Sequence, residues 1–270
     1  MIAGSSSSPT PIVDPLERPP VKLYSILEKG MSPIRHGENL DPGADAPGII
    51  QKSSGENRVP FTQLKGQISY DTFKAITVKP FRHTHMTSVQ QAVLSRLPGL
   101  AQPYNPTSLE KMKLREDLLC KAKTGTGKTL AFLVPAIEAR IASIDAHVDR
   151  ALVDAGRVGD KHMEGRIKRT FVRQNVGSII VSPTRELATQ IANEAIRLSH
   201  HHEGFEVRLF VGGISKRLQM KDWMKGRRDI VVATPGRLRD LLENEPDVSD
   251  GIKKSTQVGC SATEILGRWS

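Results

Sequence analysis

The chain has 270 residues, enough for one large domain or two small ones, and its hydrophobic fraction of 38% is low for a fully globular protein. The 39 Lys and Arg residues against 29 Asp and Glu give a net charge of +10. This charge favours an anionic partner, but it does not separate RNA from a membrane surface or from a contribution to solubility. The two cysteines, Cys120 and Cys260, are too few for a disulfide framework and fit a reducing compartment. No apolar run is long enough to span a bilayer, so we expect no membrane segment.

Composition divides the chain into three parts. Residues 1–58 are rich in Ser, Pro and Gly without a sustained apolar period, and we predict that they are disordered, with at most a short helix at 21–27. Residues 59–245 have the periodicity of a globular domain. Residues 246–270 are an aberrant tail that does not continue this pattern.

The hydrophobic periodicity predicts strands and helices that alternate along the globular part. Helices are expected at 69–76, at 88–97, from 130 onward, at 186–198 and from 237 to 242. Buried strands are expected at 118–120, where Cys120 would be a small buried thiol, and at 176–181, 207–211 and 230–233. This order predicts an α/β domain with a mostly parallel sheet flanked by helices.

The connection between the helix after residue 130 and the strand near residue 178 is unusually long, at roughly 35 residues where 2–6 are common. Residues 144–153 can form an extra helix within it. The remainder is basic, and it is either a solvated charged face or a surface that faces RNA. Its basic residues are Lys161, Arg166, Lys168, Arg169 and Arg173.

A glycine-rich motif between the short strand at 118–120 and the helix after it predicts a phosphate-binding P-loop. Gly125 and Gly127 allow the backbone amides to curl around a phosphate, and the helix directs its N-terminal N–H groups at the same anion. Lys128 would reach the β- and γ-phosphates and the Thr129 hydroxyl would bind Mg²⁺. The alternative is a Gly/Thr-rich turn with a surface lysine. The motif consists of Ala122, Lys123, Thr124, Gly125, Thr126, Gly127, Lys128 and Thr129.

Three further short motifs follow predicted strands, and a fourth precedes the P-loop. The fourth is Thr87-Ser88-Val89-Gln90, with Phe73 located 17 residues before Gln90. The Gln90 amide can both donate to and accept from an adenine edge. The other three supply hydroxyl, guanidinium and backbone N–H donors that suit phosphate and sugar contacts, although helix capping by Thr and Pro is the alternative. These three are 182–188, Gly212-Gly213 and 234–237.

Together, these motifs resemble those of the first RecA-like domain of DEAD-box RNA helicases, over about residues 73–242. The residues within the motifs are most similar to those of fungal members of the mitochondrial group. The Ala122 that replaces the first glycine of a standard Walker A motif is part of this resemblance. The resemblance implies an ATP-dependent RNA helicase that binds adenine nucleotide and Mg²⁺ through Gln90 and 122–129, with Lys128 and Thr129 in the catalytic site. It implies RNA contacts at Pro183, Thr184, Arg185, Gly212, Gly213, Thr234, Pro235, Gly236 and Arg237.

The chain also departs from the family pattern. It contains no Asp-Glu dipeptide, and Ser261-Ala262-Thr263 matches a later family motif without a preceding apolar strand, so we interpret that match as coincidence. A truncated or frame-shifted gene accounts best for the tail, and we expect the chain to be inactive alone. The family's adenine-stacking position is occupied by His83, with Phe81 two residues further from Gln90.

Two other functions stay open at this point: a non-catalytic fragment that binds ATP or RNA, and a different P-loop enzyme such as a kinase. The motif at Gln90 and the one at 234–237 argue against a kinase. The resemblance implies an intracellular, mitochondrial protein, although the N-terminus carries no clear transit peptide, and a nuclear or cytoplasmic location is the alternative. The sequence does not identify a protein partner.

Overall fold

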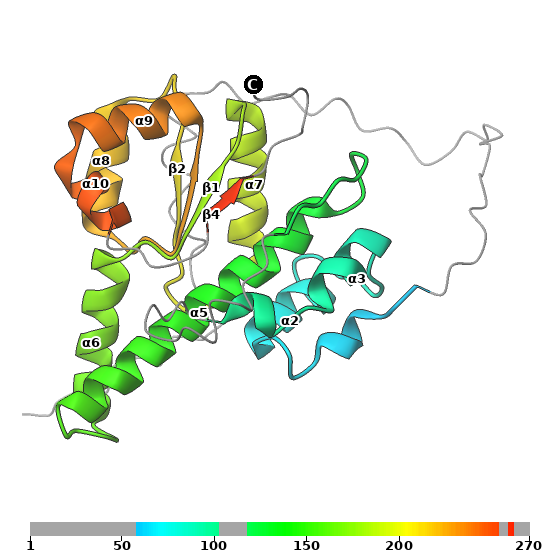
Figure 1. Ribbon diagram of the computed structural model, residues 1–270, viewed down its shortest axis with the longest axis horizontal. Coiled ribbons are helices and arrows are strands. Elements are labelled where there is room, and N and C mark those ends of the chain that lie inside the picture. The colour runs from blue at the N-terminus through cyan, green and yellow to red at the C-terminus, as the bar shows by residue number, and fades with distance from the viewer. Residues whose placement is uncertain (1–57, 103–117, 254–258, 262–270) are drawn as a thin grey trace, which may run out of the picture. The chain divides into compact units, whose positions relative to one another are not determined.

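The computed structural model describes residues 58–102, 118–253 and 259–261 (Figure 1). The prediction of disorder at 1–58, apart from Arg58, and the prediction of a helix at 21–27 lie outside these residues. Within the described part of the chain, strands and helices alternate from β1 to α9, as the periodicity predicts. The described residues therefore form an α/β domain with a parallel sheet.

The sheet has four parallel strands in the order β2-β3-β1-β4. Strand β1 (Ser178–Val181) pairs with β3 (Ile230–Ala233), and β3 pairs with β2 (Val207–Phe210). These three strands confirm the predictions at 176–181, 207–211 and 230–233. The fourth, β4 (Gly259–Ser261), was not predicted and pairs with the other edge of β1.

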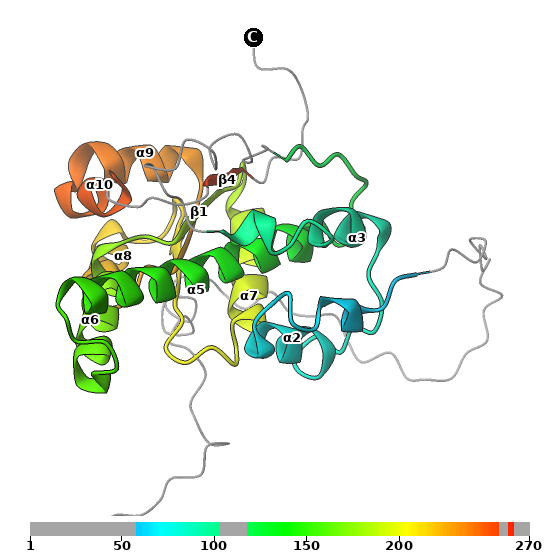
Figure 2. The ribbon, with the colours of Figure 1, turned by 60° about the horizontal axis from the view of Figure 1, so that its bottom comes forward.

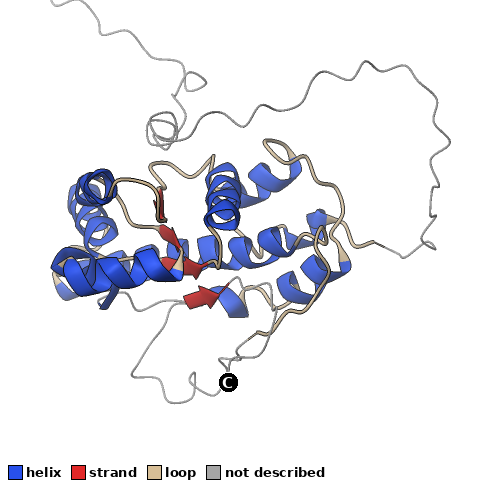
Figure 3. Cartoon of the chain, turned by 90° about the horizontal axis from the view of Figure 1, so that it is seen from above, coloured by secondary structure: helices blue, strands red, loops and turns tan. Residues whose placement is uncertain are grey.

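Helices cover both faces of the sheet (Figure 3). Successive residues of β3 point to opposite faces: Ile230 and Val232 belong to one buried cluster, and Val231 and Ala233 belong to another. The first cluster is completed by α5 (Lys128–Asp154), α7 (Arg185–Leu198) and the N-terminal helices. The second is completed by α8 (Lys216–Lys225), α9 (Pro235–Asn244) and α10 (Pro246–Lys253).

The N-terminal elements are η1 (Phe61–Leu64), α2 (Tyr70–Thr77), α3 (Ser88–Leu94) and η2 (Gly99–Ala101). Three of them, α2, α3 and η2, contact α5, and η1 contacts α2; Figures 1 and 2 show α3 beside α5. Helix α2 begins within one residue of its predicted start because Ser69 caps it and accepts a hydrogen bond from the Thr72 N–H. Helix α3 ends at Leu94, three residues earlier than predicted.

The strand predicted at 118–120 is wrong. This segment lies outside the described sheet, Leu119 is 83% exposed, and Cys120 is exposed rather than a buried thiol. Three apolar residues bury themselves as a strand only where a neighbouring strand pairs with their backbone. None of the four strands of the described sheet pairs with this segment.

The long connection predicted before β1 is a helical hairpin. Helix α5 continues through 144–153 to Asp154, and α6 (Lys161–Gln174) returns alongside it. Ile144, Val148 and Leu152 recur every four residues and form a separate small core with Val172. This apolar stripe explains why the segment is helical and not a loop.

The last described helix, α10, adds Val248 to the second core cluster, where its side chain is fully buried. The domain boundary expected at residue 245 stays a prediction. Among the described helices, none combines the length and the hydrophobicity needed to cross a membrane.

Candidate nucleotide and RNA sites

The predicted P-loop is a closed turn directly before α5. Gly125 and Gly127 have φ angles of 76° and 78°, in the left-handed region that favours glycine. The Lys128 ammonium donates hydrogen bonds of 2.7 Å to both the Ala122 and Lys123 carbonyl oxygens. The loop's own carbonyls therefore hold the ammonium group over the start of the helix, where the N–H groups of the first turn attract an anion.

Gln90 and Thr87, the N-cap of α3, lie against the P-loop, although Gly127 of the loop follows Gln90 by 37 residues in the sequence. The Thr87 hydroxyl donates to the Thr126 carbonyl over 2.8 Å, and the Gln90 amide nitrogen donates to the Gly127 carbonyl over 3.3 Å. The Gln90 amide oxygen accepts from the Thr87 N–H at 3.0 Å. Gln90 is only 5% exposed, and a Cβ added at Gly127 would lie 2.4 Å from its amide nitrogen. One N–H and one lone pair of the amide are left for a ligand.

The predicted magnesium ligand, Thr129, is tied to α7. Burial raises the pKa of Glu194 on that helix, while the Thr129 side chain and the nearby Arg197 oppose the rise. The Thr129 hydroxyl oxygen has lone pairs that can bind a cation. Among the described residues no group of three or more His, Cys, Asp and Glu side chains could hold a metal ion. Mg²⁺ commonly keeps phosphate and water ligands, so a single protein oxygen fits a nucleotide-bound ion.

The two candidates for adenine stacking lie together. The ring centroids of Phe81 and His83 are 5.6 Å apart, and the Arg197 guanidinium lies 4.5 Å from the centroid of Phe81. Phe81 is half-buried and already has a cation on one face, whereas His83 is exposed. The His83 ring also stacks on Phe61, with centroids 6.3 Å apart, but His83 is the more exposed of the two candidates.

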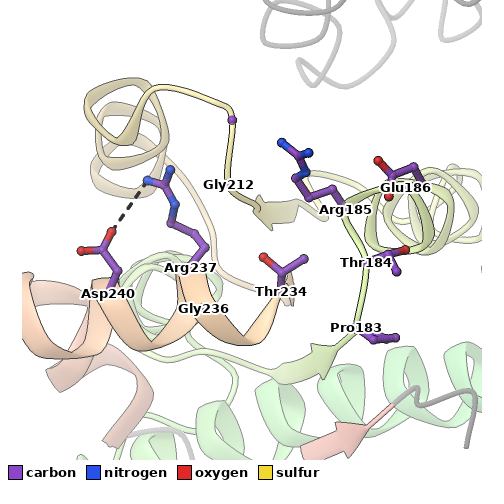
Figure 4. Close-up of a pocket in the computed structure, with 10 residues that line it drawn as sticks. Pro183, Thr184, Arg185, Glu186, Gly212, Thr234, Gly236, Arg237 and Asp240 are labelled. Atoms are coloured by element: carbon purple, nitrogen blue, oxygen red, sulfur yellow. Dashed lines mark ion pairs between the residues drawn. The ribbon is translucent and has the colours of Figure 1, made fainter. Parts of the chain in front are cut away.

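A second site is a cavity of about 550 Å³ at the carboxyl ends of β1, β2 and β3 (Figure 4). This edge is where ligands gather in open α/β sheets. Eight of the nine residues expected to contact RNA line it, and Pro235 alone does not. Glu186, from the motif at 182–188, and Asp240, which belongs to no motif, line it as well. The eight are Pro183, Thr184, Arg185, Gly212, Gly213, Thr234, Gly236 and Arg237.

The two arginines of this cavity are held differently. Arg185 is exposed and makes no ion pair with a described residue, and a Cβ added at Gly213 would lie 2.5 Å from its guanidinium. Arg237 is 14% exposed; it donates to the Ile214 carbonyl at 3.1 Å and lies 3.9 Å from the Asp240 carboxylate. Arg185 is therefore available to an anion, whereas Arg237 is already oriented by its neighbours.

The ammonium group of Lys216 offsets the negative charge of Asp240, one of the acids that line the cavity. Its ammonium lies 3.2 Å from Asp240 and 3.1 Å from Glu245. The hydrogen bond from Lys216 lowers the pKa of Asp240. Together with Arg185 and Arg237, this lysine balances the carboxylates, so an anionic ligand is not repelled from the cavity.

Comparison with known proteins identifies the family. The model of the DEAD/DEAH box helicases matches residues 103–258, more than half of the chain. The chain therefore belongs to the DEAD/DEAH box helicase family. It is 34% identical over 79% of its length to the rice DEAD-box ATP-dependent RNA helicase 26. It is 32% identical over 74% of its length to the mitochondrial ATP-dependent RNA helicase mss116 of Aspergillus oryzae.

The matches cover much less of the relatives than of this chain. The chain spans 32% of the rice protein and 27% of the Aspergillus protein. Among solved structures, Mss116p bound to single-stranded RNA and AMP-PNP is 29% identical, with a TM-score of 0.47 over 72% of this chain and 31% of that one. Plant as well as fungal helicases are similar to the chain, so its place within the family is not fixed by these matches.

Proposed function

We propose that this chain supplies the ATP-binding and part of the RNA-binding surface of an ATP-dependent RNA helicase, as its N-terminal RecA-like domain. One observation carries the proposal: three segments separated by about 20 to 30 residues converge on one cavity at the carboxyl edge of the sheet. The P-loop is the second site in the same domain. The names of the relatives, which are ATP-dependent RNA helicases, support this pairing of ligands.

In the nucleotide half of the proposal, the amides of 122–129 and the Lys128 ammonium bind the phosphates, and Gln90 binds the adenine edge. Lys128 leaves the Ala122 and Lys123 carbonyls and moves to the phosphates, because an anion attracts an ammonium more strongly than a neutral carbonyl does. Thr129 contributes one ligand to Mg²⁺, which the nucleotide brings with it.

In the RNA half, the exposed Arg185 and the oriented Arg237 bind phosphate oxygens, with backbone N–H groups beside Gly212, Gly213 and Gly236. Such contacts position a strand without reading its bases, so we expect binding without sequence preference. Thr184 already caps α7 by accepting from the Leu187 N–H, and its hydroxyl hydrogen remains to donate.

Calorimetric titration tests the nucleotide half. We expect Lys128→Ala to abolish ATP binding, and we expect Lys65→Ala, which removes an exposed lysine far from the P-loop in sequence, to leave it unchanged. Equal affinity of the wild type and Lys128→Ala for ATP would refute the assignment.

Binding to a short single-stranded RNA at several salt concentrations tests the RNA half. Loss of two phosphate contacts in the double variant Arg185→Ala, Arg237→Ala should reduce the slope of log affinity against log salt by about 1.4, from roughly 0.7 per contact. RNA affinity that does not depend on salt, or that survives both substitutions, would contradict the proposal.

We further propose that the 270-residue polypeptide, taken alone, does not hydrolyse ATP or unwind a duplex. Phosphoryl transfer in P-loop enzymes needs a Walker B acid for Mg²⁺. Asp229 is fully buried at the start of β3, paired with Arg140 at 2.9 Å and with Arg227 at 2.8 Å, and Asp240 is bonded to Lys216. RNA-dependent phosphate release by the purified polypeptide, absent in Lys128→Ala, would show that another acid acts.

The second candidate function is that of a non-catalytic fragment that binds ATP or RNA. The same phosphate-release assay tests it on a version of the chain that carries an Asp-Glu strand and a second domain. Inactivity of that version as well would favour the non-catalytic function. A mitochondrial location is supported by one relative whose name is mitochondrial, and a nuclear or cytoplasmic location is the alternative. Fluorescence microscopy of the tagged protein in its own cells separates the three.

A further inference from the structure

The hairpin of α5 and α6 carries a charged surface that the proposed function does not use. Helix α6 ends at Gln174, just before the amino end of β1, whereas the cavity lies at the carboxyl ends of the strands. Figure 1 shows α6 at the lower left and α9 at the top of the view. The surface is therefore separate from the candidate RNA cavity.

The hairpin is held together by its own contacts. Ile144, Val148 and Leu152 of α5 pack against Val172 of α6, and all four are buried. At the base of the hairpin, Arg140 of α5 donates to the Asn175 carbonyl at 2.9 Å. The outer face of α6 is therefore displayed at a fixed position relative to the sheet.

The outer face of α6 is strongly basic. The helix carries five Lys and Arg residues and one Glu, a net charge of 5 − 1 = +4. The exposed residues Arg166, Arg169 and Arg173 are spaced by three and four positions, so they lie on one face of the helix. We call these three residues the arginine stripe. None of the three makes an ion pair with another described residue, whereas Lys161 is paired with Glu164 at 3.5 Å.

The arginine stripe opposes the stability of the helix. Like charges at these spacings destabilise a helix by about 0.2–0.5 kcal/mol per pair. No described carboxylate relieves this repulsion, but an anionic ligand would. The stripe rises about 10 Å along the helix axis, at 1.5 Å per residue, which is long enough to meet more than one phosphate of a nucleic acid strand.

The residues on the outer face of α6 distinguish between two anionic partners, a membrane surface and a nucleic acid backbone. The apolar residues Met163, Ile167 and Phe171 pack against the small core of the hairpin, so they are not free to insert into a lipid surface. Guanidinium groups bind phosphate oxygens in a bidentate geometry, and arginines outnumber lysines on this face. Both points favour a phosphate backbone over a membrane.

We propose that the arginine stripe is a second, sequence-independent RNA contact, which binds the phosphate backbone of an RNA segment that extends beyond the cavity. The proposal rests on the proposed function, because it assumes that RNA reaches this domain. It makes a specific claim: a long structured RNA uses the stripe, and a short single strand confined to the cavity does not.

The test compares two RNAs and two triple variants of the whole chain by fluorescence anisotropy over a range of salt. One RNA is a short oligouridylate, and the other is a hairpin with a single-stranded tail. The stripe variant is Arg166→Gln, Arg169→Gln, Arg173→Gln. The control removes the same charge from exposed positions elsewhere, as Arg58→Gln, Lys65→Gln, Lys253→Gln.

For the stripe variant we expect about tenfold weaker binding of the tailed hairpin and a salt slope smaller by about 2, from roughly 0.7 per lost phosphate contact. Binding of the oligouridylate should not change, and the control variant should bind both RNAs like the wild type. A version with Lys at the three stripe positions keeps the charge and should recover most of the affinity. Circular dichroism of each variant verifies that α6 is folded.

Equal loss in the control variant, or unchanged binding of the tailed hairpin by a folded stripe variant, would overturn the inference. The inference would also be overturned if the stripe variant bound both RNAs like the wild type and lost only binding to phosphatidylserine vesicles. The two proposals fail separately. If the wild type binds the tailed hairpin through the stripe but the oligouridylate not at all, the cavity assignment is wrong and the stripe assignment stands.

Discussion

The contact between Gln90 and Gly127 makes the P-loop sensitive to a single methyl group. We expect Gly127→Ala to destabilise the protein more than Gly125→Ala, although both glycines have nearly the same positive φ, 78° and 76°. A Cβ at Gly127 would lie 2.4 Å from the Gln90 amide nitrogen, whereas a Cβ at Gly125 has no atom within 4 Å. The pair therefore separates the backbone cost from the cost of the contact.

The magnitude follows from these two parts. An alanine in the left-handed region costs about 1–2 kcal/mol, which is all that Gly125→Ala should lose. At Gly127 the new methyl group also displaces Gln90, which breaks its hydrogen bonds to the Thr87 N–H and the Gly127 carbonyl. Two such bonds contribute about 0.5–1.5 kcal/mol each. We therefore expect a loss of about 2–5 kcal/mol for Gly127→Ala.

Urea unfolding of the two variants measures this difference, and a titration with ATP then compares their affinities. Adding Gln90→Ala to Gly127→Ala removes the steric conflict, so the double variant should lose less than the sum of the two single changes. The reasoning is refuted if Gly127→Ala and Gly125→Ala unfold at the same urea concentration, or if the double variant is fully additive.

Three further outcomes are expected. Asp229→Asn leaves the buried Arg140 and the largely buried Arg227 without their carboxylate and should cost about 3–5 kcal/mol in urea unfolding. Burial lowers the pKa of His202 below its usual value of about 6.5, so the folded state favours the neutral ring. The neutral ring therefore contributes fully to stability above the unfolded pKa of about 6.5, and this contribution is lost as pH falls below that value through the lower pKa of the folded state. Between pH 7 and pH 5, thermal unfolding of His202→Gln should show a smaller loss of stability than that of the wild type. Thr87→Ala removes a helix cap and the bond to the Thr126 carbonyl and should cost about 1 kcal/mol and weaken ATP binding in calorimetry.

The sheet could be predicted from the sequence because its strands are continuous apolar runs. In β3 all four residues are buried, and the run Ile230–Ala233 stands between polar turns. The same reasoning fails at residues 118–120, since the apolar run there is equally clear but the described sheet provides no adjacent strand. Burial of a strand depends on a partner that is distant in sequence, which periodicity does not reveal.

The helix predicted at 144–153 is confirmed as the end of α5, but the second half of the hairpin, α6, was missed. The hairpin's apolar residues, from Ile144 to Leu152, have the helical period, but the many charges of 161–173 conceal the matching stripe on α6. The long basic run suggests a loop because charge, not periodicity, dominates its composition. The structure shows that the second half is a helix, which Asp160 caps and which packs against α5 through Val172 and Phe171.

The residues of the two sites were predicted from motifs, but the connection between the sites could not be. Arg185, in the cavity, is the first residue of α7, and nine residues later on the same helix is Glu194, whose pKa the side chain of the P-loop residue Thr129 lowers against the effect of burial. Nine residues of helix span about 13 Å. Glu194 belongs to no motif that the sequence suggested. It lies beside the P-loop because α5 and α7 pack on the same face of the sheet, so a single rigid helix contacts both candidate sites.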